Sequence, residues 1–162
     1  MKKLILLTIL SLFVNLAMAS WSQTKGPYGG NINCIVTNGS NIYASNYGGG
    51  VFHSSNNGGS WTPVNNGIDD KYVKSLAISG SNLFAGTYTK GIYISTNNGA
   101  SWSQINTGLI NLNVSSLVVS GTNIFAGTYG GVFISTDNGS NWAPINNGLT
   151  NLGISSLAVE GT

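Results

Sequence analysis

An eight-residue block occurs three times in this chain, and its spacing constrains the fold more than any other feature of the sequence. The copies read SSNNGGSW at 54–61, STNNGASW at 95–102 and STDNGSNW at 135–142, so the period is about 40 residues. The flanking sequence repeats as well, because Ala-Gly-Thr-Tyr occurs at both 85–88 and 126–129. A period of this length with several short strands per repeat is typical of propeller blades, arrays and solenoids.

Each period predicts four short strands. In the third repeat the strands are expected at 114–119, 124–128, 132–136 and 141–145, with Gly and Asn in every gap between them. The strand segments are rich in β-branched and aromatic residues, and outside the N-terminal segment no stretch has a helical period. Four antiparallel strands in about 40 residues is the size of one propeller blade. The sequence therefore predicts an all-β chain of four-stranded antiparallel β-propeller blades.

The repeated block has a structural explanation. Its third residue, Asn or Asp, can accept hydrogen bonds from turn N–H groups, and the Gly at its fifth position can take a positive φ. The Trp that ends the block can bury a large ring against the sheet. We therefore predict that each block fastens the hairpin between the third and fourth strands. The residues assigned this structural role are Ser54, Asn56, Gly58, Trp61, Ser95, Asn97, Gly99, Trp102, Ser135, Asp137, Gly139 and Trp142.

The pattern Ser-x-Asp/Asn-x-Gly-x-Ser-Trp resembles the Asp-box, or bacterial neuraminidase repeat. That family's propellers include sialidases, sortilin-type receptors and photosystem assembly factors. The resemblance implies a β-propeller fold over nearly all of the chain after its N-terminal segment. Two copies depart from the family pattern by having Asn in place of Asp, and the third has Asn141 in place of Ser or Thr. All of these replacements keep a hydrogen-bonding side chain.

The number of repeats predicts an open arc. Trp21 aligns with the Trp of each block, so the mature chain opens on the fourth strand of a blade, and it ends at 157–162 just after a first strand. This gives about three and a half blades, whereas propellers close with roughly four to eight. We read the chain as the N-terminal part of a longer protein. The further blades would come from a missing C-terminal sequence or from another copy. In the second case, short arcs would assemble with one another into rings.

The first residues read as a signal peptide covering 1–19, which leaves 20–162 as the Asp-box β-propeller repeats. Lys2 and Lys3 precede an apolar run, and Ala17-Met18-Ala19 is a small-residue cleavage motif. The expected location is therefore extracellular, periplasmic or at the cell surface, without stable membrane insertion after cleavage. The alternative is an uncleaved N-terminal anchor.

Charge and cysteine content exclude several classes of function. Without Lys2 and Lys3, four lysines face four acidic residues, which is too little positive charge for nucleic-acid binding. A polybasic patch for membranes is absent for the same reason. Cys34 is the only cysteine, so no intrachain disulfide can form. We interpret it as a small strand residue, the alternative being a reactive thiol or an intermolecular bridge.

Catalytic residues are hard to assemble from this sequence. The resemblance to sialidases would imply three arginines that bind the substrate carboxylate, and this chain contains no Arg. Asp69, Asp70 and Glu160 do not make a convincing two-carboxylate glycosidase site. His53 has no metal-ligating partner at a suitable spacing, and we interpret it as a strand residue. We expect no catalytic site, no cofactor and no metal in this chain.

Three tyrosines are the candidate ligand-binding residues. Tyr47, Tyr88 and Tyr129 recur at the turn between the second and third strands, on the face that also carries the Asn-rich connections between blades. An arc of Tyr rings with neighbouring amides suits a sugar or a peptide. The alternative is that each Tyr only packs on the neighbouring blade. The favoured function is a secreted non-catalytic module for protein or carbohydrate interaction or scaffolding, and the alternative is the N-terminal part of a sialidase-like glycoside hydrolase whose catalytic residues lie outside this chain.

Overall fold

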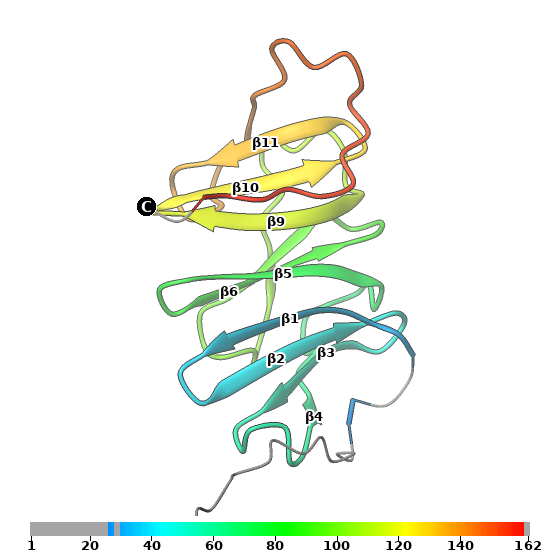
Figure 1. The fold of residues 1–162 in the computed structure, drawn as a ribbon, viewed down its shortest axis with the longest axis vertical. Coiled ribbons are helices and arrows are strands. Elements are labelled where there is room, and N and C mark those ends of the chain that lie inside the picture. The colour runs from blue at the N-terminus through cyan, green and yellow to red at the C-terminus, as the bar shows by residue number, and fades with distance from the viewer. Residues whose placement is uncertain (1–25, 28–29, 161–162) are drawn as a thin grey trace, which may run out of the picture.

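The computed structural model describes residues 26–27 and 30–160. The predicted signal peptide and Trp21 lie outside these residues. The described chain is all-β and forms three four-stranded antiparallel sheets that stack face to face as an open arc (Figure 1). This confirms the prediction of an open β-propeller segment. In the described part no helix is long and apolar enough to cross a membrane.

Each sheet is one repeat, and its strands follow each other in chain order across the sheet. The first blade contains β1 (Ile32–Asn38), β2 (Asn41–Asn46), β3 (Gly50–Ser54) and β4 (Thr62–Pro63). The second blade contains β5 (Val73–Ser79), β6 (Asn82–Thr87), β7 (Ile92–Ser95) and β8 (Ser103–Gln104). The third blade contains β9 (Val114–Ser120), β10 (Asn123–Thr128), β11 (Gly131–Ser135) and β12 (Ala143–Pro144).

The hydrophobic core lies between the blades, where alternate strand residues meet those of the next sheet. One cluster joins the first two blades and includes Tyr43, Val51, Val73 and Leu83. An equivalent cluster joins the second and third blades around Phe84 and the residues packed against it. Each blade is therefore stabilised by its neighbours as well as by its own hydrogen bonds.

The fourth strand of each blade is much shorter than the sequence predicts. In the third blade β12 covers two residues, although 141–145 was expected to be extended. In the third blade the backbone N–H of Trp142 donates across the blade boundary to the carbonyl oxygen of Thr107, at 2.9 Å. Among the described residues β4 has the same length without an equivalent bond. Pro144 also lacks an N–H group for the sheet. The residue that leads into β12 therefore forms a backbone hydrogen bond with the preceding blade and not within its own sheet.

The repeated blocks form the hairpins between the third and fourth strands. In the second block the Ser95 hydroxyl donates to Asn97 Oδ1 at 2.9 Å and accepts from the N–H of Gly99 at 2.8 Å. Asn97 Oδ1 also accepts from the N–H of Ser101. The fifth-position glycines have φ between 83° and 85°. The residue before each of these glycines, Asn98 and its two equivalents, is also left-handed, with φ of 54° to 57°, which was not predicted from the sequence.

The segment after the third blade lies where the first strand of a further blade was predicted. Residues 151–160 run along the third sheet without forming a strand with any described residue (Figure 1). The N–H of Ile154 donates to the carbonyl oxygen of Thr128 at 2.9 Å, and the N–H of Leu157 donates to Ser116 Oγ at 3.1 Å. The segment therefore covers part of the third blade by itself.

Candidate ligand-binding face

Tyr47, Tyr88 and Tyr129 lie at equivalent turns, directly after the second strand of each blade. Their side chains are 62%, 47% and 61% exposed. The N–H of each tyrosine donates to a carbonyl oxygen at the start of the same blade, on Asn31, Tyr72 and Asn113 respectively. Their backbones are therefore fixed while their rings remain open to solvent. We call the edge of the stack that carries these three turns the tyrosine face.

The neighbouring blade covers these rings only in part. The ring of Tyr47 contacts that of Tyr72, which begins the second blade, with 4.6 Å between the ring centroids. Tyr72 is itself 42% exposed. Tyr47 therefore packs against the next blade, as one of the two interpretations expected, and most of its side chain is still exposed. The sequence analysis did not single out Tyr72, because only one repeat has an aromatic residue at that position.

A lysine lies between the other two tyrosines. The Lys74 ammonium nitrogen is 4.6 Å from the ring centroid of Tyr88 and 5.5 Å from that of Tyr129. These distances are within the range of cation–π attraction. The same ammonium donates a hydrogen bond to Asn113 Oδ1 at 3.2 Å. Sequence reasoning passed over Lys74, although it stands where the other repeats have Asn33 and Ser115.

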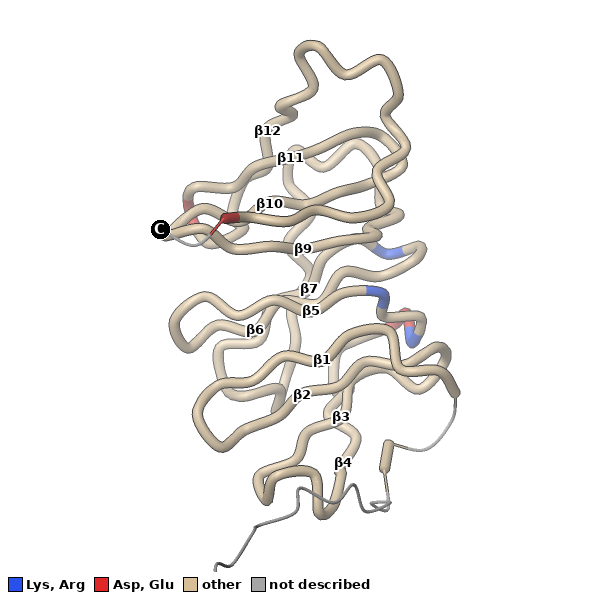
Figure 2. Tube along the Cα trace, in the orientation of Figure 1, with Lys and Arg blue, Asp and Glu red and all other residues tan. Residues whose placement is uncertain are grey.

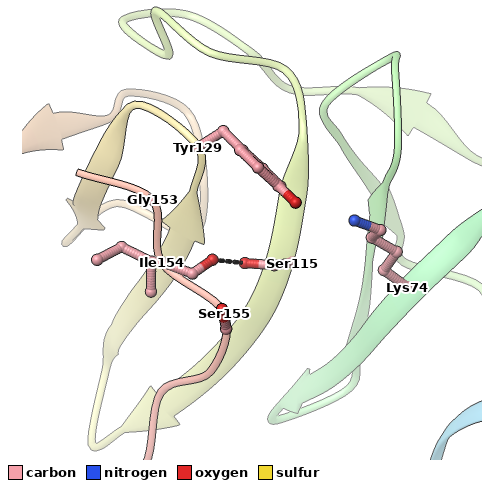
Figure 3. Close-up of a pocket in the computed structure, with 6 residues that line it drawn as sticks. All are labelled: Lys74, Ser115, Tyr129, Gly153, Ile154 and Ser155. Atoms are coloured by element: carbon pink, nitrogen blue, oxygen red, sulfur yellow. Dashed lines mark hydrogen bonds between the residues drawn. The ribbon is translucent and has the colours of Figure 1, made fainter. Parts of the chain in front are cut away.

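A pocket of about 200 Å³ opens beside Lys74, between the second blade, the third blade and the C-terminal segment. Figure 3 shows the Tyr129 hydroxyl and the Lys74 ammonium pointing toward the same space, with Ser115 on the strand between them. Residues 153–155 form the remaining wall. The pocket therefore combines an aromatic ring, hydroxyl groups and one positive charge.

Charge is unevenly distributed over the stack. In Figure 2 the lysines of the described chain lie at the edge that carries the tyrosine face, and some of the acidic residues lie at the opposite edge. One acidic residue near the tyrosine face is buried: Asp70 accepts hydrogen bonds from the N–H of Tyr72 and from both the N–H and the hydroxyl of Thr89. Asp70 thus fastens the connection that precedes the second blade to the turn after β6.

Nothing in the described residues assembles a metal site, since no group of three or more His, Cys, Asp or Glu side chains lies together there. His53 stacks on Tyr43, with 4.8 Å between the ring centroids, and its Nε2 lies 2.7 Å from Asn41 Oδ1. Burial raises the pKa of the Cys34 thiol, which lies 3.7 Å from the carbonyl oxygen of Leu76. A raised pKa leaves less of the reactive thiolate. His53 therefore contacts the neighbouring strand of its own blade, and Cys34 contacts the first strand of the second blade.

The residues of the repeated blocks lie away from the tyrosine face. Antiparallel strands place the turn after the second strand and the hairpin after the third strand at opposite edges of a blade. The hydroxyl-bearing residues Ser54, Ser95 and Ser135 are buried, as are Trp102 and Trp142. Trp61 differs, because it is only partly buried and its indole nitrogen has no hydrogen-bond partner among the residues that the structure describes. In the described structure no blade precedes the first one to receive it.

Comparison with solved structures shows the fold. No protein-family model matches the chain, and no curated protein matches its sequence. Similar structures include an ancestral GH74 enzyme (TM-score 0.60, 24% identity over 76% of this chain) and YCF48 bound to a D1 peptide (0.61, 18%, 75%). The extracellular domain of BT4673 from B. thetaiotaomicron is also similar (0.62, 20%, 78%).

These neighbours are β-propeller proteins, and their likeness to this chain is one of fold. The match covers 19% of the GH74 enzyme, 42% of the YCF48 chain and 18% of the BT4673 domain. The chain therefore spans less than half the length of these propeller proteins. They include an enzyme and a protein with a bound peptide.

Proposed function

We propose that this chain is an exported, non-catalytic β-propeller segment that binds a protein or carbohydrate ligand on its tyrosine face. The observation that carries the proposal is the recurrence of an exposed tyrosine at the same turn of all three blades. Exposed aromatic rings held on fixed backbones are typical of binding surfaces, because they offer apolar area at a low cost in side-chain entropy. The peptide bound to YCF48 supports the proposal as a precedent on a related fold.

The absence of catalysis is part of the same proposal. Among the described acidic residues, Asp70 is committed to the hydrogen bonds with Tyr72 and Thr89, and Asp137 to those of its block. Neither carboxylate is free to act as an acid, a base or a nucleophile without breaking the contacts that hold its turn. The chain has no Arg to bind an anionic transition state. The blades then serve as the scaffold for the tyrosine face.

The proposal is tested by screening the chain against peptide and glycan arrays, with the Tyr47→Ser, Tyr88→Ser and Tyr129→Ser variants beside it. Because the rings are largely exposed, the variants are expected to fold with a small loss of thermal stability and to lose binding. Ile35→Ser is the matched control, since Ile35 is 58% exposed but lies in the middle of β1. Ligands that bind all three Tyr variants as well as the unmodified chain would refute the tyrosine face. Hydrolysis of arrayed glycans by the chain would refute the non-catalytic role.

A further inference from the structure

One position in the first strand of each blade links that blade to the next. In the first blade, Asn33 Nδ2 donates to the carbonyl oxygen of Val73 at 2.9 Å. In the third blade, the Ser115 hydroxyl donates to the carbonyl oxygen of Ile154, the residue equivalent to Val73 (Figure 3). A small neutral donor therefore suffices for this link. In the second blade the position holds Lys74, whose hydrogen bond goes to the side chain of Asn113 instead.

The environment of Lys74 leaves its charge available. None of the six residues that line the pocket is acidic. An ammonium group has three donors, and the described hydrogen bond to Asn113 uses one of them on a neutral oxygen. The rings of Tyr88 and Tyr129 hold the ammonium near the pocket through cation–π contacts, and both remain open to solvent. Lys74 therefore contacts the third blade through Asn113 and Tyr129, and the remaining donors of its ammonium can bind an anionic ligand.

We propose that this pocket binds a peptide carboxylate, with Lys74 as its charged contact. The inference rests on the proposed function of the tyrosine face and names the chemistry of its ligand. A carboxylate takes hydrogen bonds from an ammonium and a hydroxyl, here those of Lys74 and Tyr129, and both groups point into the pocket (Figure 3). The aliphatic stem that carries the carboxylate would lie on the Tyr129 ring.

The lining favours a peptide over an acidic sugar. Apart from Lys74 and Tyr129, the polar side chains of the pocket are two serines, and the single hydroxyl proton of Ser115 is already shared by the carbonyl oxygens of Ile154 and Gly127. A pyranose ring carries several hydroxyls that would enter the pocket without partners, and each unpaired polar group weakens binding. A carboxylate on an apolar stem brings only two oxygens. A volume of about 200 Å³ suits a side chain or a chain terminus.

The test is a nuclear magnetic resonance titration of the full chain with acetyl-Ala-Glu-Ala-amide. We expect the signals of Ser115 and residues 153–155 to shift. We expect acetyl-Ala-Gln-Ala-amide to bind at least about tenfold more weakly, because the charge-assisted hydrogen bond is lost. Acetyl-Ala-Ala-Ala with a free carboxylate tests the chain terminus as the source of the anion. Binding of either peptide carboxylate at these residues supports the proposal.

Variants of Lys74 separate ligand binding from folding. Lys74→Asn copies the first blade and is expected to fold normally while weakening binding of the Glu peptide at least about tenfold. Lys74→Arg keeps the charge and should retain binding. Thr96→Asp makes the same change of net charge at an exposed residue of the second repeated block, away from the tyrosine face and outside the pocket, and its affinity should stay within about twofold.

Three results would overturn the proposal: neither peptide carboxylate binding more tightly than the Gln peptide, unchanged binding of the bound carboxylate peptide by Lys74→Asn, or tighter binding of glucuronate than of both carboxylate peptides. The proposed function is judged separately. If an array-selected ligand is lost in Tyr88→Ser but binds Lys74→Asn with full affinity, the tyrosine face stands and the carboxylate pocket is wrong.

Discussion

The indole nitrogen of Trp102 donates a hydrogen bond to the carbonyl oxygen of Val64, 2.8 Å away across the boundary between the second and first blades. The backbone N–H of the same tryptophan donates to Asn66 in the same connection. Trp142 repeats the arrangement with the carbonyl oxygen of Ile105, also at 2.8 Å. The last residue of each of these blocks therefore fastens its own blade to the preceding one.

Replacing Trp102 with Ala should lower the free energy of unfolding by about 3–5 kcal/mol, because the ring is buried and a cavity would remain between two blades. Trp61→Ala is the matched control and should cost clearly less, since Trp61 is partly exposed and its indole donates no hydrogen bond to a described residue. Urea denaturation of both variants measures the difference. Equal losses would mean that the block stabilises its own hairpin only.

The hydroxyl of Ser95 organises its hairpin from inside. It donates to Asn97 Oδ1, accepts from the N–H of Gly99 and is 1% exposed. Ser95→Ala should therefore cost about 1–3 kcal/mol, because a buried N–H group loses its partner. Ser101→Ala, in the same block but exposed, should change the free energy of unfolding by less than about 0.5 kcal/mol. Indistinguishable urea midpoints for the two variants would rule out this role for the hydroxyl.

Asp137 makes the third block sensitive to acid. Hydrogen bonds from the side chain and backbone of Asn141 and from Ser135 hold the pKa of Asp137 below its ordinary value. Since the folded-state pKa is the lower one, the ionised group stabilises the fold above the unfolded-state pKa. This contribution is lost as the pH falls below about 4 and through the folded-state pKa.

Asp137→Asn should remove that part of the pH dependence, because the first two blocks already use Asn at this position. The check is thermal unfolding of both proteins between pH 2 and pH 6 in matched buffers, with the two transition temperatures compared at each pH. The variant should lose less stability on acidification than the parent chain. Parallel curves would show that the block does not discriminate between the ionised and protonated carboxyl groups.

The fold was predictable because the sequence pattern of one blade occurs three times. A period of about 40 residues, with Gly or Asn in every gap, defines the strands of each blade within a residue or two, as β9 and β10 illustrate. The length of the fourth strands was not predictable. In the second and third blades the residue before the strand donates to the preceding blade, as Trp142 does to Thr107. Such contacts depend on how the sheets stack, and no pattern within one repeat reveals them.

The candidate site was predictable only where it repeats. Tyr47, Tyr88 and Tyr129 stand out because they return in every blade, whereas Lys74 occurs once and was counted only in the net charge. The sequence did mark this position, because Lys74 replaces the small neutral residues, Asn33 and Ser115, that occupy it in the other repeats. The structure was needed to show that this departure places an ammonium beside two exposed rings and a pocket.

Amide hydrogen exchange of the full chain, with and without a ligand selected on the arrays, tests the central claim most directly. The account predicts that the ligand slows exchange at the turns of the tyrosine face, residues 47–50, 88–91 and 129–131, because bound ligand opposes the local opening that exposes their hydrogen-bonded N–H groups. The repeated blocks at the opposite edge should exchange as before. Slower exchange confined to those blocks, with the tyrosine turns unchanged, would contradict the account.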